Sequence, residues 1–323
     1  MSVFHPTEAA FSGFALIRRE WKAVLAWAGL RFAVSVVLTV AIALLAADDL
    51  ARFAALTAGA PEQMSDPTQL LNLFKGLEPL VLVTLPVSFL LQVVMIAALY
   101  RACLRPGERR FAYLRFGRGE LVVGAVLILL WLLYMAGLFA FVFAVLIIAT
   151  VAGQIDPSLA GLVAALAVVV FIGGHIWAFV RFSLVVADSF DRSTISLFHS
   201  LKLTHGHFWS LFGAYVLAFA FTVVLSLMAL AAFMILAAVV ALATGQGLAA
   251  VAEVFNPQAA GLAATFSAAM VAWLLFSALT GACSYPLVLG PTAEAYKAFR
   301  LREAAPPADR FHEEDGQPAP AGA

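Results

Sequence analysis

Charge is scarce in this sequence of 323 residues. Only 12% of the residues are Asp, Glu, Lys or Arg, whereas 63% are hydrophobic and the mean hydropathy is +0.99. Soluble domains carry roughly 25% charged residues. The composition therefore excludes an ordinary soluble protein and indicates a membrane protein. The 19 basic and 19 acidic residues cancel, so no excess of positive charge points to nucleic acid as a partner.

Catalytic and metal-binding motifs are missing as well. The chain has no H-E-x-x-H, no G-x-S-x-G, no Walker loop and no dinucleotide fingerprint. His205 and His207 are two residues apart, which puts them on different faces of a helix, and neither they nor His199 have a Cys or carboxylate at a zinc-site spacing. The only cysteines, Cys103 and Cys283, fall toward the side assigned below to the reducing cytoplasm. We therefore expect no enzyme activity, cofactor, metal or disulfide.

Long apolar runs dominate the chain instead. Each has at least about 20 residues, the length that crosses roughly 30 Å of hydrocarbon as a helix. The first run exceeds the roughly 7 to 15 residues of a signal-peptide core, so we expect it to be retained as a span. The sequence predicts an all-α polytopic protein with one membrane domain, residues 1–303, and a disordered cytoplasmic tail, residues 304–323. The six predicted spans are about 23–47, 80–100, 121–151, 160–180, 209–244 and 261–289.

Amphipathic stretches flank several of these runs. Asp66 is suited to cap a short helix that begins at Pro67 and lies on the outer surface before the second span. Asp191 is suited to cap another helix within residues 182–208, on the opposite side. Two further segments have the apolar spacing of helices that lie flat at the membrane interface, residues 14–25 and residues 245–260.

Positive charge is concentrated between the second and third runs. Of the 19 basic residues, sixteen fall on one side of the six-span topology, two on the other and one inside a span. The positive-inside rule then places both termini in the cytoplasm. The densest group of arginines lies in residues 101–120 and consists of Arg101, Arg105, Arg109, Arg110, Arg115 and Arg118.

Two compatible interpretations of this arginine-rich segment are open. The arginines beside Phe111 and Phe116 are suited to bind anionic lipid head groups while the aromatic rings enter the interface. Alternatively they only fix the topology, with Glu108 and Glu120 pairing some of them.

Strongly polar side chains inside the spans are few. They are Arg31, Gln92 and His175, with Arg181 at the end of a span. Because an ionisable group at membrane depth is costly, it is a candidate for function, and a shared cavity near Arg31, Gln92 and His175 would suit a small permease. The structural alternative is that Arg31 extends toward the interface and His175 bonds a neighbouring carbonyl. No Asp or Glu lies deep in a predicted span, which weighs against an ion-coupled carrier.

Three segments carry a resemblance to known proteins. They are Leu104-Arg105-Pro106 with Tyr113-Leu114-Arg115 and Glu120-Leu121, then Ser200–Trp209, then Pro291–Tyr296. With these the chain resembles a group of uncharacterised bacterial six-span integral membrane proteins and the membrane domain of some glycerophosphodiester phosphodiesterases. The resemblance implies a multi-pass protein of the bacterial inner membrane with no established activity. This sequence has no appended soluble catalytic domain, so the phosphodiesterase activity is not carried over.

The sequence thus predicts a non-enzymatic membrane domain. We expect it to engage membrane lipids, anionic ones included, or a protein partner through its arginine- and aromatic-rich cytoplasmic face. The small permease is the alternative.

Overall fold

The computed structural model describes residues 5–45, 67–243 and 268–304. Regular structure in these ranges is helical, and no strand occurs in them. Six helices in these described ranges are long and apolar enough to cross a membrane. The chain is therefore an all-α, multi-pass membrane protein, and the prediction of six spans is confirmed. The six helices are α2 (Trp21–Leu45), α4 (Pro67–Leu104), α5 (Arg118–Ile155), α6 (Pro157–Phe182), α9 (Phe208–Ala243) and α12 (Ala268–Ala304).

These helices form because a helix satisfies every backbone hydrogen bond within its own segment, which hydrocarbon demands. The most apolar stretches of α2, α5, α6 and α9 are not buried within the protein. Large apolar side chains such as Phe143, Ile147 and Val169 are more than half exposed along α5 and α6. This surface is suited to contact lipid chains.

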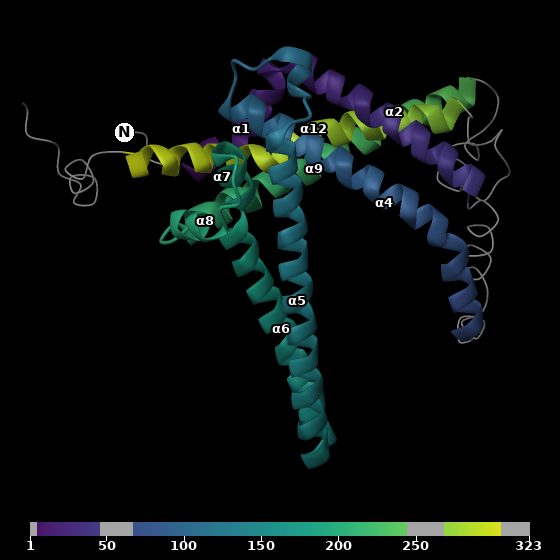
Figure 1. The fold of residues 1–323 in the computed structure, drawn as a ribbon. Helices are drawn as coiled ribbons and strands as arrows, with labels where there is room; N and C mark the ends of the chain where they lie inside the picture. The colour runs from purple at the N-terminus through teal and green to yellow at the C-terminus, as the bar shows by residue number, and fades with distance from the viewer. Residues whose placement is uncertain (1–4, 46–66, 244–267, 305–323) are drawn as a thin grey trace, which may run out of the picture.

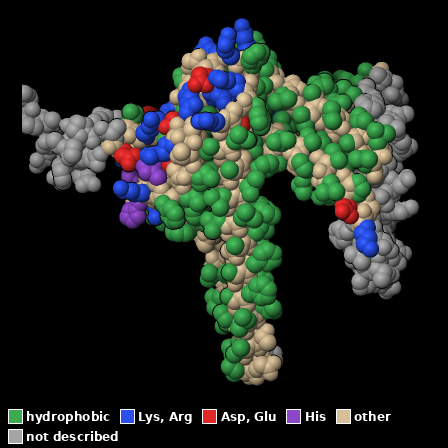
Figure 2. Space-filling model, in the orientation of Figure 1, with side chains coloured by type: hydrophobic (Ala, Val, Ile, Leu, Met, Phe, Trp, Pro, Cys, Tyr) green, Lys and Arg blue, Asp and Glu red, His purple; other side chains and the backbone are tan. Residues whose placement is uncertain are grey.

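Helices α5 and α6 form an antiparallel hairpin that extends away from the other four long helices (Figure 1). Asp156 lies between them and accepts a hydrogen bond from the backbone N–H of Ser158 at 2.8 Å, while Pro157 occupies the first position of α6. At its other end the hairpin meets the rest of the protein. Figure 2 shows a largely hydrophobic surface along the hairpin, with Lys and Arg gathered over that other end.

We call this end the base. It comprises α1 (Pro6–Arg19), the loop of residues 105–117 with its short turn η2 (Arg110–Tyr113), α7 (Val185–Arg192), α8 (Leu197–Leu203) and residues 292–304 of α12. The largest fully buried side chains lie in or beside the base. They are Trp27, Tyr100, Tyr113, Phe190 and Tyr296. The charged end is thus also the place where the protein is best packed.

Two details of the sequence prediction are corrected. The expected short surface helix at Pro67 is instead the beginning of α4, which continues to Leu104 through Pro79 and Pro86. Each proline removes one backbone hydrogen bond of a helix, and α4 bends along its length in Figure 1. Asp191 does not cap a helix, because it lies in the last turn of α7, and α8 follows Ser196.

Three predictions fall outside the described residues. They concern Asp66 as a cap, the segment 245–260 and residues 305–323 of the predicted tail. Residue 304, where the predicted tail begins, is instead the last residue of α12.

Helix α1 crosses α12 at glycine. A Cβ on Gly13 would lie 2.4 Å from the carbonyl oxygen of Pro286 and 2.7 Å from the Cα of Leu287. A Cβ on Gly290 would in turn lie 3.0 Å from the Cα of Gly13. The two backbones therefore touch, as small residues allow in packed membrane helices.

We predict that Gly13→Ala destabilises the protein by about 1–3 kcal/mol, because the added methyl group must push α1 away from α12. Gly29→Ala is the matched control, since no atom of the described residues packs within 4 Å of a Cβ at that position. Denaturant titration in detergent micelles measures both variants. Equal stability of the two would show that α1 does not pack here.

Candidate functional site

The arginine-rich segment is built around a buried ion pair. Arg101, 5% exposed at the end of α4, bonds Glu120, 1% exposed in the first turn of α5. The other carboxylate oxygen of Glu120 accepts the backbone N–H of Gly117 at 2.9 Å. Glu120 therefore fixes both ends of the loop at once. The Nε of Arg101 also lies 3.6 Å from the carboxylate of Glu108, so the expected pairing of arginines with both glutamates is observed.

The loop contains a left-handed turn. Phe111, Ala112 and Tyr113 have φ values of 52°, 56° and 65°, a conformation that costs a non-glycine residue roughly 1–2 kcal/mol. Two side chains from other elements hold it. The indole N–H of Trp27 donates to the carbonyl of Ala112 at 2.8 Å, and Arg101 donates to the carbonyl of Tyr113. Strain of this kind persists only when the surroundings impose it.

The turn separates buried from exposed side chains. Tyr113 points inward and is 1% exposed, whereas Phe111 is 83% exposed and Phe116 is 70% exposed. Apart from Pro106, the exposed side chains of this loop and of Arg118, the first residue of α5, are arginine and phenylalanine, and we call these the loop face. It consists of Arg109, Arg110, Phe111, Arg115, Phe116 and Arg118.

The arginines of the loop face differ in their partners. Arg109 pairs with Glu20 at 3.0 Å and Arg115 pairs with Glu108 at 3.3 Å. Within the described ranges, Arg110 and Arg118 contact no carboxylate. Two exposed cationic groups are thus available to an anionic ligand beside two exposed aromatic rings.

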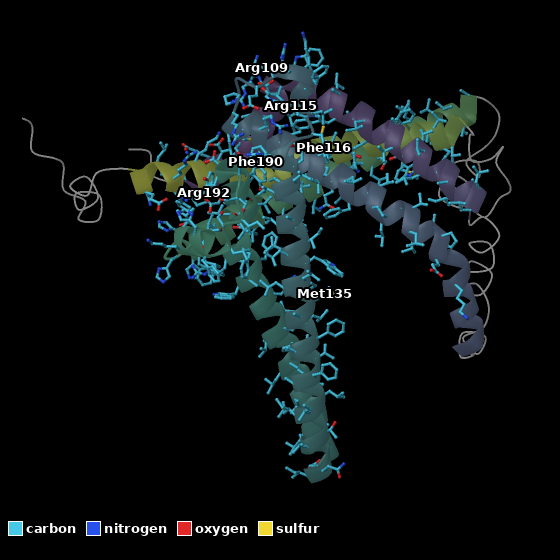
Figure 3. The ribbon with its side chains drawn as sticks, viewed as in Figure 1. Arg109, Arg115, Phe116, Met135, Phe190 and Arg192 are labelled. Atoms are coloured by element: carbon cyan, nitrogen blue, oxygen red, sulfur yellow. The ribbon has the colours of Figure 1, made fainter. Side chains whose placement is uncertain are left out.

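Arg105 faces inward and joins the loop to α7. Its guanidinium lies 5.2 Å from the ring centre of Phe190, and that of Arg101 lies 5.7 Å from the same ring, distances that suit cation–π contacts. Arg105 also donates to the carbonyl of Asp191 at 3.1 Å. In Figure 3, Phe190 lies between Arg109 and Arg115 of the loop face and Arg192 of α7.

A second polar cluster surrounds Asp188, which is fully buried in α7. Its carboxylate accepts from Arg192 at 2.9 Å, from the hydroxyl of Ser196 at 2.6 Å and from the phenol of Tyr296 at 3.3 Å, and His199 Nδ1 lies at 2.9 Å. A buried carboxylate needs such partners.

The end of α12 is joined to the same cluster. Tyr296 also donates to the carboxylate of Asp191 at 2.9 Å, which Arg300 bonds as well. His199 Nε2 lies 3.2 Å from the carboxylate of Glu303. The polar contacts thus fasten α7, α8 and α12 to one another.

The polar residues predicted inside the spans do not share one site. Arg31 on α2 packs against Tyr285 of α12, whereas the ring of His175 on α6 lies 5.1 Å from that of Tyr134. Helices α2 and α6 diverge in Figure 1. The side chain of Gln92 is exposed on α4. Arg181, at the end of α6, contacts the hydroxyl of Thr204 at 3.4 Å and the ring of Trp177.

No group of three or more His, Cys, Asp or Glu side chains in the described ranges is placed to hold a metal ion. A cavity of about 310 Å³ lies between α1 and α12, beside the end of α4. Its lining combines the carboxylates of Glu8 and Glu294 with the guanidinium of Arg19 and the thiol of Cys103. With both signs of charge present, this cavity favours no particular ligand.

The sequence did not reveal the Asp188 cluster or the partner of Trp27. Their members are up to 108 residues apart in the chain, so no local spacing indicates them. One signal was present: Asp188 is an acidic residue in a short stretch that is otherwise largely apolar.

We predict that Glu120→Gln lowers the free energy of unfolding by roughly 3 kcal/mol, because it leaves Arg101 buried without its main counter-charge. Glu108→Gln is the matched control. Glu108 is a more exposed partner of the same arginine, so its loss should cost less than about 1 kcal/mol. Both are measured by denaturant titration in micelles, and equal losses would contradict the central role of Glu120.

Comparison with known protein families, with curated proteins and with solved structures gives no match to this chain. The resemblance to the bacterial six-span group remains a prediction from the sequence.

Proposed function

We propose that this chain is a non-enzymatic protein of the bacterial inner membrane, with both termini in the cytoplasm, whose loop face binds anionic lipid head groups. The observation that carries the proposal is the left-handed turn, which holds Phe111 outward beside Arg110, an arginine with no carboxylate partner among the described residues. In this topology the base lies on the cytoplasmic side, where α1 and α8 rest at the interface. The gathering of basic residues over the base supports that orientation (Figure 2).

The chemistry of the loop face suits a lipid surface. The transfer of exposed phenylalanine rings from water into the boundary between head groups and acyl chains is favourable. Each nearby arginine adds roughly 1 kcal/mol of attraction to anionic lipids. Arg101 and Arg105 face inward and stabilise the conformation of the loop through contacts within the protein. The ligand-binding arginines in this proposal are therefore Arg110 and Arg118, with Arg109 and Arg115 in secondary roles because they pair with glutamates.

The other candidates receive less support. A protein partner would use the same exposed side chains, but the combination of free arginines with protruding phenylalanines beside membrane spans favours lipid. The small permease remains a prediction without a supporting observation, since Arg31, Gln92 and His175 lie on separate elements with separate contacts.

Native mass spectrometry of protein released from nanodiscs of phosphatidylglycerol and phosphatidylcholine tests the proposal. We predict that the double variant Arg110→Gln/Arg118→Gln lowers the preference for phosphatidylglycerol by roughly 30-fold, because two surface charges contribute about 2 kcal/mol.

The matched control is Arg109→Gln/Arg115→Gln, which removes the same charge from the same loop. Its effect should be smaller, since both arginines already have carboxylate partners. A wild-type preference for phosphatidylglycerol in the Arg110→Gln/Arg118→Gln variant would refute lipid binding by the loop face.

A further inference from the structure

Arg31 lies in a cradle formed by α12. Its guanidinium rests against Gly281, where an added Cβ would lie 2.6 Å from Nη2 and 2.7 Å from Cζ. One helical turn further along α12, the ring centre of Tyr285 lies 5.6 Å from the guanidinium, and its hydroxyl accepts a hydrogen bond from Nη1 at 3.4 Å. Glycine and tyrosine at this spacing hold the guanidinium flat on the helix.

The hydrogen-bonding capacity of this arginine is largely unused. A guanidinium has five N–H donors, and the contact with Tyr285 uses one of them. Nε is buried and has no partner, and within the parts of the chain that the structure describes no carboxylate contacts Arg31. Tyr285 accepts from Arg31, so its own O–H remains able to donate. A positive charge inside a span without a counter-ion is costly.

The position of Arg31 makes the site reachable. Both Arg31 and Tyr285 are half-buried, so part of each side chain is open to the surroundings. Arg31 lies four residues after Trp27, whose indole bonds the left-handed turn of the loop. Residues four apart lie on one helix face, about 6 Å apart along the axis. Arg31 is therefore one turn beyond the base, within reach of a group that enters from the interface.

We propose that Arg31 and Tyr285 form an oxyanion-binding site between α2 and α12, distinct from the loop face. The ligand group is a phosphate or a carboxylate, because only an acceptor with several oxygens matches an array of N–H and O–H donors around one positive charge. Its source is either the head group of an anionic lipid or a soluble oxyanion.

Two arms distinguish these sources, both in an Arg110→Gln/Arg118→Gln background so that the loop face does not contribute. The first arm measures phosphatidylglycerol retention by native mass spectrometry, as above. The second measures the thermal shift given by inorganic phosphate to protein in neutral detergent. The variants are Arg31→Gln and Tyr285→Phe, and Tyr134→Phe on α5 is the control for removal of a half-exposed phenol.

We expect the affinity for the oxyanion measured in one of the two arms to fall roughly tenfold or more in Arg31→Gln and about tenfold in Tyr285→Phe. This is the effect of losing a hydrogen bond to a charged group. Tyr134→Phe should change neither arm. Weaker retention of phosphatidylglycerol in the first arm identifies a lipid as the ligand. A smaller thermal shift with phosphate in the second arm identifies a soluble oxyanion.

Gly281→Ala is a further variant, which keeps Arg31 but displaces its guanidinium. It should weaken binding in the same arm that Arg31→Gln affects. Gly29→Ala, two residues before Arg31 on α2, is its control. Unchanged binding in both arms for Arg31→Gln and Tyr285→Phe would overturn the proposal, whatever the loop face does.

Discussion

The structure of the base depends on the ion pair between Arg101 and Glu120. Two buried charges are costly to remove from water, and they are tolerated because each has further hydrogen-bond partners. Arg101 bonds the carbonyl of Tyr113, and Glu120 bonds the N–H of Gly117. This one ion pair thereby joins the last turn of α4 to the first turn of α5 and stabilises the strained turn between them. The exposure of Phe111 is a consequence of that arrangement.

Arginine occurs in three different settings in this protein. Arg101 and Arg105 face the aromatic ring of Phe190 and stabilise the base from within. Arg110 in the loop and Arg118 at the start of α5 face outward without carboxylate partners in the described ranges. Arg31 is a third case, since it lies inside a span and most of its donors have no partner among the described residues. The same side chain is thus a structural counter-charge at Arg101, the proposed lipid-binding group at Arg110 and Arg118, and the proposed internal anion site at Arg31, according to which acceptors its position provides.

Much of the fold was predictable because hydropathy and length alone locate membrane helices, and α2, α6 and α9 begin and end within a few residues of the predicted spans. Pairing of Glu108 and Glu120 with loop arginines was also predictable from their proximity in the chain. The contact between Trp27 and Ala112 was not, because it joins segments 85 residues apart. Asp191 was misassigned because a good capping residue serves equally well as a partner for Tyr296 and Arg300.

The depth of Phe111 in a bilayer most directly tests the proposal that the loop face binds lipid at the membrane interface. A spin label on Phe111→Cys, in a Cys103→Ala/Cys283→Ala background, can be compared with a label free in water and with one on Phe143→Cys of α5. We predict that the label at position 111 collides with dissolved oxygen more often than the free label does, and with a water-soluble nickel complex less often, so that it approaches the behaviour of the label at position 143. A label at position 111 that behaves like the free label would contradict it.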